Sequence, residues 1–522
     1  MIRSGKAAVL ACALSLAAAC TPARKVPVDT VPPIDWTARL AAADTLYAAG
    51  HYTALRDARR IYGEALTGAP EKAGIAEKLI RAAIASDLRK KDLGVLSPGS
   101  PVDLYPLAAA EPALSRYALW LELLAGLPNK IKGSPGIEGT GGRALDAHLD
   151  WVSARVPTIE ADLERSAGID DLAAALRLAL RADFHIFRDK IDPKTVPGLH
   201  PGSRLAAFQA AVSPAIDIGT LEALLALDPE FSEVHYYLGE AALKAGKLLT
   251  AERHFLTAHE KIPESLSILI SLAKVAFQME ETESCLEWNE KALALLPTYR
   301  DALLGKGLCL GNLGRAEEAL AVLGRLLELG TYYMGEGNYW MAWNFNALER
   351  FEEARKFIES AKTFLFDVVD VHTLSGIIAY RQGRLDDAER DLRHTLDLQS
   401  SESDAAYYLG RLYADRKEWL NSGVYFAGAA MSYKDQEKSL EGKIGEIEAS
   451  EMSADRKARL VAKKRAQILT VRATKATCQY NGAAGYHNAG SFERALELAR
   501  SAAAHPAFAE KAVELIRIIQ DR

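Results

Sequence analysis

Prolines recur at intervals of 34 residues in the middle of this chain, at Pro229, Pro263 and Pro297. A fixed period of that length is typical of repeat architectures, in which each unit buries its apolar face against its neighbours. The chain has 522 residues, more than one compact core usually supports, so it folds either as several globular domains or as one elongated array. The 34-residue period favours the array.

Successive units carry small and aromatic residues at matching positions. Gly239 and Phe255 in the first unit correspond to Gly410 and Phe426 in the sixth, and six units run in phase over 232–436 with one single-residue slip. Each unit is predicted to form two helices of about a dozen residues, joined by a short turn with Gly or Asn. This pattern resembles the tetratricopeptide repeat, a helix–turn–helix unit whose small residues let its two helices approach closely.

The resemblance implies an all-α fold, a right-handed helical solenoid of the tetratricopeptide type with an irregular helical region before it. Composition agrees, because Ala and Leu dominate and both favour helices. The expected order along the chain is a signal peptide at 1–19, a Pro-rich tether at 20–35, a helical region with degenerate repeats and two long loops (126–142 and 189–203) at 36–231, six repeat units at 232–436, a charged helical hairpin at 437–475, and a seventh unit with a capping helix at 476–522.

The N-terminus carries an export signal. Arg3 and Lys6 precede an apolar run that is too short to span a bilayer and that ends in Ala-Ala-Ala before Cys20. The run resembles a bacterial lipobox, although Ala17 stands where that motif usually has Leu. The resemblance implies that Cys20 is lipidated, with acyl chains such as palmitate anchoring the protein. The alternative is a plain secretory signal with an incidental cysteine.

If Cys20 is lipidated, the protein is expected in the bacterial cell envelope. Thr21, rather than Asp, after the cysteine favours the outer membrane, with the protein facing the periplasm. The Pro-rich segment that follows would act as an extended tether of roughly 40 Å.

The sequence contains no motif that indicates catalysis, a metal site or a cofactor. It has no His-Glu-x-x-His, paired-cysteine zinc spacing or glycine-flanked serine, and its glycine-rich segment at 126–142 lacks the Gly-Lys-Ser/Thr ending of a phosphate-binding loop. A net charge of −6 gives no reason to expect nucleic-acid binding. We therefore expect a protein that is not an enzyme.

The cysteines after Cys20 are few and far apart in the sequence. Cys285, Cys309 and Cys478 are odd in number, so they imply no disulfide framework. Cys285 occupies the small-residue position of its unit and is predicted to be a buried free thiol.

In this repeat family the concave face, formed by the first helix of each unit, usually carries function. The corresponding positions predict a groove of aromatic and charged side chains, at Tyr236, Lys274, Tyr339, Trp343, Tyr407, Arg411 and Tyr480, accompanied by Glu240, Phe277, Asn346, Tyr380 and Arg381. Such a groove suits a peptide or another extended polar ligand. The alternative for the aromatic residues near Trp340 is that they fill the gap where the repeat slips by one residue.

The predicted function is an envelope-anchored scaffold that binds a protein or peptide partner. The alternative is a ligand-binding accessory lipoprotein of a solute transport system. The basic run over 456–475 either pairs with the acidic helix before it or binds phosphate, lipid or a partner. The sequence leaves the oligomeric state open.

Overall fold

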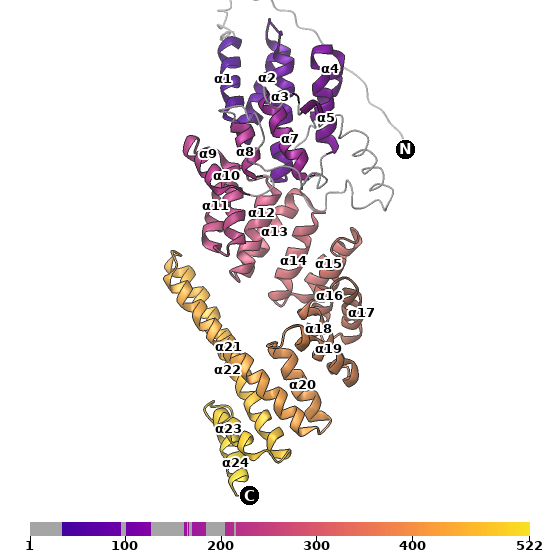
Figure 1. The fold of residues 1–522 in the computed structure, drawn as a ribbon, viewed down its shortest axis with the longest axis vertical. Coiled ribbons are helices and arrows are strands. Elements are labelled where there is room, and N and C mark those ends of the chain that lie inside the picture. Colours follow the sequence, from indigo (N-terminus) through magenta and orange to yellow (C-terminus); the bar gives the residue numbers. More distant parts are fainter. Residues whose placement is uncertain are drawn as a thin grey trace, which may run out of the picture.

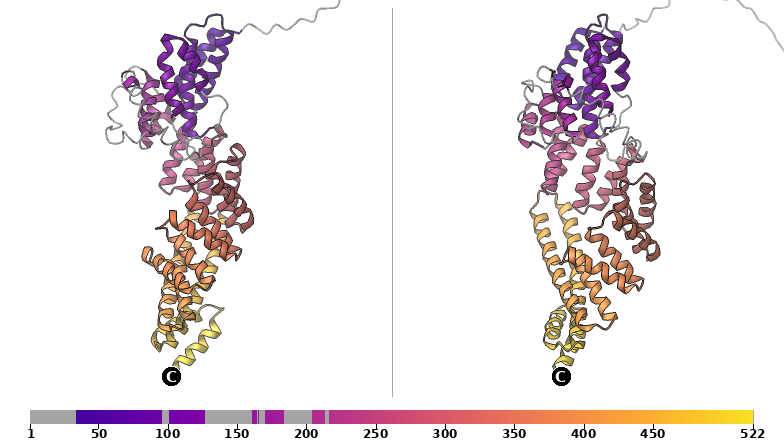
Figure 2. Two further views of the ribbon diagram at one scale, coloured as in Figure 1. Left: turned by 90° about the vertical axis from the view of Figure 1, so that its right-hand side faces the viewer. Right: turned by 45° about the vertical axis from the view of Figure 1, so that its right-hand side comes forward.

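The computed structural model describes residues 34–95, 101–126, 161–163, 165, 170–183, 204–212 and 216–521. The predicted signal peptide, Cys20, most of the predicted tether and almost all of both predicted loops lie outside these residues. Within the described ranges every regular element is a helix, and consecutive helices pack as neighbours. The predicted all-α, tetratricopeptide-type fold is confirmed. Figure 2 shows an elongated molecule, with α1 to α5 toward one end and the C-terminus at the other.

The repeat array consists of paired helices joined by short turns, as predicted. We number the units from one and call the two helices of each unit its first and second helix. Units one to six are formed by α10 (Ser232–Lys244), α11 (Leu248–Lys261), α12 (Leu266–Gln278), α13 (Thr282–Leu295), α14 (Arg300–Asn312), α15 (Ala316–Glu328), α16 (Met334–Ala347), α17 (Phe351–Phe364), α18 (Val369–Arg381), α19 (Leu385–Leu398), α20 (Ser403–Asp415) and the first part of α21 (Trp419–Ala449).

Small residues on the first helices make room for large side chains of the second. A Cβ placed on Gly239 would lie 2.5 Å from the ring of Phe255, and one on Gly410 would lie 2.8 Å from the ring of Phe426. Both aromatic rings are almost fully buried. The repeat motif therefore encodes a small-to-large contact inside these pairs of helices.

The turn inside a unit uses one residue in the left-handed region. Unit one has Gly246 there, with φ of 73°, whereas units two and four have Glu280 and Glu349, with φ of 61° and 58°. A side chain in this conformation costs energy that glycine avoids. The glutamate of unit two, Glu280, also binds Lys464, which lies 184 residues further along the chain.

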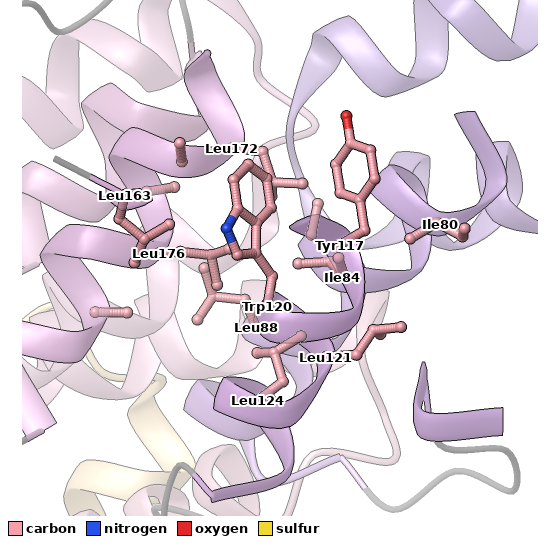
Figure 3. Close-up of a cluster of buried hydrophobic side chains, with 14 of the residues drawn as sticks. Ile80, Ile84, Leu88, Tyr117, Trp120, Leu121, Leu124, Leu163, Leu172 and Leu176 are labelled. Atoms are coloured by element: carbon pink, nitrogen blue, oxygen red, sulfur yellow. The ribbon is translucent and has the colours of Figure 1, made fainter. Parts of the chain in front are cut away.

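The region before the array is a helical layer with a large core of its own, and it shares two smaller hydrophobic clusters with the first repeat helices. It contains α1 (Trp36–Ala49), α2 (Tyr52–Gly68), α3 (Ile75–Leu93), α4 (Tyr105–Ala110), α5 (Ser115–Gly126), α7 (Asp171–Asp183), α8 (Arg204–Val212), α9 (Ile218–Leu227) and two 3-10 turns at Pro101–Leu104 and Pro112–Leu114. Figure 3 shows Trp120 at the centre of this core, where its ring meets Tyr117 edge-on at 5.1 Å.

Two buried polar contacts join this layer to the array. The backbone N–H of Tyr52 donates to the fully buried carboxyl group of Glu233 on α10. The hydroxyl of Ser265 donates to the carbonyl of Leu93 at 2.5 Å, which links the end of α3 to the start of α12.

The C-terminal region is dominated by a helical hairpin. Its arms are the 31-residue α21 and the 35-residue α22 (Ala454–Asn488), which are followed by α23 (Phe492–Ala503) and α24 (Ala509–Gln520). The hairpin is longer than predicted, because α21 begins as the second helix of unit six and α22 ends as the first helix of unit seven. Figure 1 shows it running back along the array toward α11. Within the described ranges, no helix has the length and apolar character needed to cross a membrane.

Candidate functional site

A cavity of about 230 Å³ lies between units two and three, lined mainly by their first helices. Two predicted groove residues line it, Lys274 and Phe277, both from α12. Asp301 and Tyr333 lie across from them, and the Tyr333 hydroxyl donates to the Asp301 carboxylate. Burial and the nearby carboxylate raise the pKa of Tyr333, so this phenol is neutral. The cavity thus combines an apolar wall with an exposed ammonium group.

Cys285, beside this cavity, is not the free thiol that we predicted. It forms a disulfide with Cys309, and the Cα atoms of the two residues are 6.5 Å apart. The 24-residue separation concealed this proximity, because the second helix of unit two packs directly against the first helix of unit three. Cys478 is a buried free thiol, and burial raises its pKa to about 12.

The predicted residues of units one and four lie mainly in helix contacts. Tyr236 packs against Phe255 of α11, with ring centroids 6.0 Å apart. Trp340 meets Tyr339 at 5.2 Å and Trp343 at 5.7 Å, and all three side chains are half-buried against the core of units three and four. This arrangement agrees with the alternative of gap filling near Trp340.

The strongest concentration of groove residues lies on units five and six. The guanidinium of Arg411 on α20 is 5.0 Å from the ring centroid of Tyr380 and 5.9 Å from those of Tyr407 and Tyr408. We call these four side chains the tyrosine–arginine cluster. The Tyr380 hydroxyl donates to Asp415 at 2.7 Å, and burial together with this carboxylate raises the Tyr380 pKa to about 12.

The prediction included Tyr380, Tyr407 and Arg411 but missed Tyr408 and Asp415. Both lie on α20, three residues before and four residues after the arginine. Side chains at these spacings share one face of a helix, so the sequence carried a signal that could have found them.

A second cavity of about 240 Å³ adjoins this cluster. Arg411 and Asp415 line it from α20, Trp419 from α21, and Asn481 and Asn488 from α22. The ring of the predicted groove residue Tyr480 packs instead on Phe508, at 5.4 Å. A shift of one residue on a helix turns a side chain by about 100°. In unit seven the asparagine that follows the tyrosine is therefore the residue at the cavity.

The basic run on the hairpin is largely paired within the chain. Near its end, Arg472 and Lys475 pair with Glu437 of α21, as expected for two helices with opposite charge. Near its start, Arg456 binds Glu252 of α11 at 2.7 Å and also Glu281, which precedes α13. The run therefore pairs both with the acidic helix and with the repeats themselves.

We call the contacts at the hairpin tip the clasp. It joins Arg456 to Glu252 and Glu281, and Lys464 to Glu280. Burial would raise the pKa of Glu280, but the bonds from Lys464 and from Gln467 (2.9 Å) outweigh it and hold the pKa below its ordinary value. The clasp connects unit six, through the hairpin, to units one and two.

The described ranges hold no group of three or more His, Cys, Asp or Glu side chains placed to bind a metal ion. No family model and no curated relative matches the sequence.

Solved structures match parts of the helix array. A tetratricopeptide repeat protein from Parabacteroides merdae is 15% identical and aligns over 50% of this chain and 93% of its own, with a TM-score of 0.35. PilF of Pseudomonas aeruginosa is 18% identical over 38% of this chain and 89% of its own, with a TM-score of 0.34. YrrB, described as a TPR protein with an unusual peptide-binding site, is 22% identical over 36% of this chain and 97% of its own, with a TM-score of 0.29. Likeness at this level says nothing of a partner or a location for this chain.

Proposed function

We propose that this protein is an envelope-anchored scaffold that binds an extended segment of a protein partner across the first helices of units five to seven. The tyrosine–arginine cluster beside the 240 Å³ cavity is the observation that carries the proposal. Tyr and Arg are, with Trp, the residue types enriched among side chains that dominate binding energy at interfaces. Their stacking fixes the guanidinium before a partner arrives, which lowers the entropy lost on binding.

The far wall of the cavity suits a peptide backbone. Asn481 and Asn488 line it from α22, and a side-chain amide can both donate to a backbone carbonyl and accept from a backbone N–H. Asp415 and Arg411 add one charge of each sign. Alternating donors and acceptors along a groove favour an extended chain with polar side chains over a purely apolar ligand.

The proposed location rests on the N-terminal sequence, in which Cys20 is the lipidated residue and the outer membrane the destination. The disulfide between Cys285 and Cys309 supports an oxidising compartment, because disulfides are rare in proteins of the cytosol. Replacing Cys20 with Ala should release the protein from the membrane fraction. Sedimentation of the variant with membranes at high salt would contradict anchoring through this residue.

Selection of peptides from a random displayed library tests the groove. Peptides selected on the purified protein should bind Arg411→Gln about tenfold or more weakly, because the charge and its stacked geometry are both lost. Arg393→Gln is the matched control, since its guanidinium also lies over a tyrosine ring (Tyr413, 5.9 Å) but belongs to the second helix of unit five. Calorimetric titration of the two variants measures the difference.

Two outcomes would contradict the proposal: no peptide is enriched, or the enriched peptides bind Arg411→Gln as tightly as the parent. Circular dichroism melting of both variants checks that the array is intact. Tyr407→Ala is a poorer probe than Arg411→Gln, because the Tyr407 ring also packs on Phe426 at 5.9 Å.

A further inference from the structure

A third cavity, of about 340 Å³, lies at the seam between the hairpin tip and the repeats. Its walls come from three places: the turn of unit one around Gly246–Thr250, the turn of unit two around Gln278–Glu280, and hairpin residues between Lys443 and Lys464. Its volume is within the range of small-molecule sites, about 300–1,000 Å³. No part of the groove that we propose for the partner belongs to it.

Apolar side chains line much of this seam cavity. Leu248 and Met279 come from the repeats, and Ile447, Met452 and Leu460 come from the hairpin. Met279 and Leu460 are buried, and the other three are half-buried. Methionine adapts its shape easily, so such a wall accepts an aliphatic chain.

The polar lining of the seam cavity favours a negative head group. Lys247 and Lys443 are exposed, and neither forms an ion pair with another described residue. Glu280 is bound by Lys464, and the charge of Lys443 also helps to lower the Glu280 pKa. The lining therefore carries three lysines, Lys247, Lys443 and Lys464, against two carboxylates, Glu280 and Glu446. The first turn of α11 also lines the cavity, and no side chain caps it. An uncapped helix start adds positive potential.

We propose that the seam cavity binds a small amphiphile with an anionic head and an aliphatic tail. The tail lies against Met279, Met452 and Leu460, and the head is held by Lys247 and Lys443. Because the walls belong to segments about 200 residues apart, this ligand binds only when the hairpin is docked. By linkage, the ligand stabilises the clasp and the clasp strengthens ligand binding.

Calorimetric titration with decanoate, below its micelle concentration, tests this site in the purified protein. One molecule should bind per chain, and octanoate, which is two methylenes shorter, should bind about fifteenfold more weakly, since each buried methylene contributes about fourfold in affinity. Decylamine has a similar tail and a positive head, and it should bind at least tenfold more weakly than decanoate. Equal binding of the two amphiphiles, or no binding of decanoate, overturns the proposal.

Variants locate the binding. Met452→Trp fills the cavity and should abolish decanoate binding, and Lys443→Gln should weaken it several-fold. Lys438→Gln is the matched control, because this exposed lysine lies on the same helix outside the cavity, and it should bind as the parent does. If Lys443→Gln and Met452→Trp both bind decanoate normally, the amphiphile lies elsewhere.

The coupling to the hairpin has its own measurement. Saturating decanoate should slow amide hydrogen exchange over residues 443–464 in the parent and leave exchange unchanged in Met452→Trp. Binding without any slowing would refute the coupled part of the proposal. Arg411→Gln should keep its full affinity for decanoate, which separates this site from the peptide groove.

Discussion

The middle of the array and the tip of the hairpin are held in different ways. Within units one, three, five and six, a glycine of the first helix faces a large apolar side chain of the second, as Gly410 faces Phe426. At the hairpin tip, charged side chains about 175–204 residues apart in the sequence meet instead, as Arg456 meets Glu281 and Glu252. The apolar contacts recur in successive units, so they appear in the sequence as a period of 34 residues. The clasp occurs once and leaves no period.

The largest effect is expected from overpacking a repeat contact. In Gly410→Leu the new side chain would collide with the Phe426 ring, already 2.8 Å from a Cβ at this position, and should lower the free energy of unfolding by up to about 3 kcal/mol. Denaturant unfolding measures the loss. Gly428→Leu is the control, because nothing lies within 4 Å of its Cβ position and a better helix former should be neutral or stabilising.

Breaking the clasp should have a smaller effect on stability but a local effect on motion. Arg456→Gln removes bonds to two carboxylates and should cost about 2 kcal/mol, with faster hydrogen exchange over residues 443–464. Arg465→Gln, whose side chain is 69% exposed and 4.0 Å from Glu448, should change stability by less than about 0.5 kcal/mol. If the two variants exchange alike, the hairpin does not depend on the clasp.

The smallest effect comes from the two glutamates in left-handed turns. Glu349→Gly should stabilise the protein by less than about 1 kcal/mol, since glycine adopts a φ of 58° without strain. Glu280→Gly gains the same relief at 61° but removes the partner of Lys464, so its hairpin should exchange faster. The difference between the two melting temperatures measures what the long-range contact contributes. An equal rise in both melting temperatures would show that the contact between Glu280 and Lys464 contributes nothing to stability.

The sequence predicted the elements that depend on local spacing. The helix pairs over 232–436 follow from periodicity, because neighbouring units repeat one contact, and the final helix follows from its amphipathic pattern. Of the predicted groove residues, Arg411 and Tyr407 lie in one cluster, whereas in unit seven Asn481 rather than Tyr480 lines the cavity.

The contacts that the sequence did not reveal join residues from different units. The bond between Cys285 and Cys309 depends on how unit two stacks on unit three, and a cysteine count does not contain this. The basic run over 456–475 was predicted either to pair or to bind a partner. The pairing of this run with Glu280 and Glu281 depends on the hairpin lying back along the repeats. That arrangement is a property of the folded chain.

Open arrays of this kind behave like springs, because each unit touches only its neighbours and the ends are free to wind or stretch. The hairpin braces this spring by connecting unit six to units one and two. A change in the curvature of the array between units two and six must then either bend the hairpin or break the clasp. The units between them should accordingly unfold together, whereas an unbraced array would fray from its ends one repeat at a time.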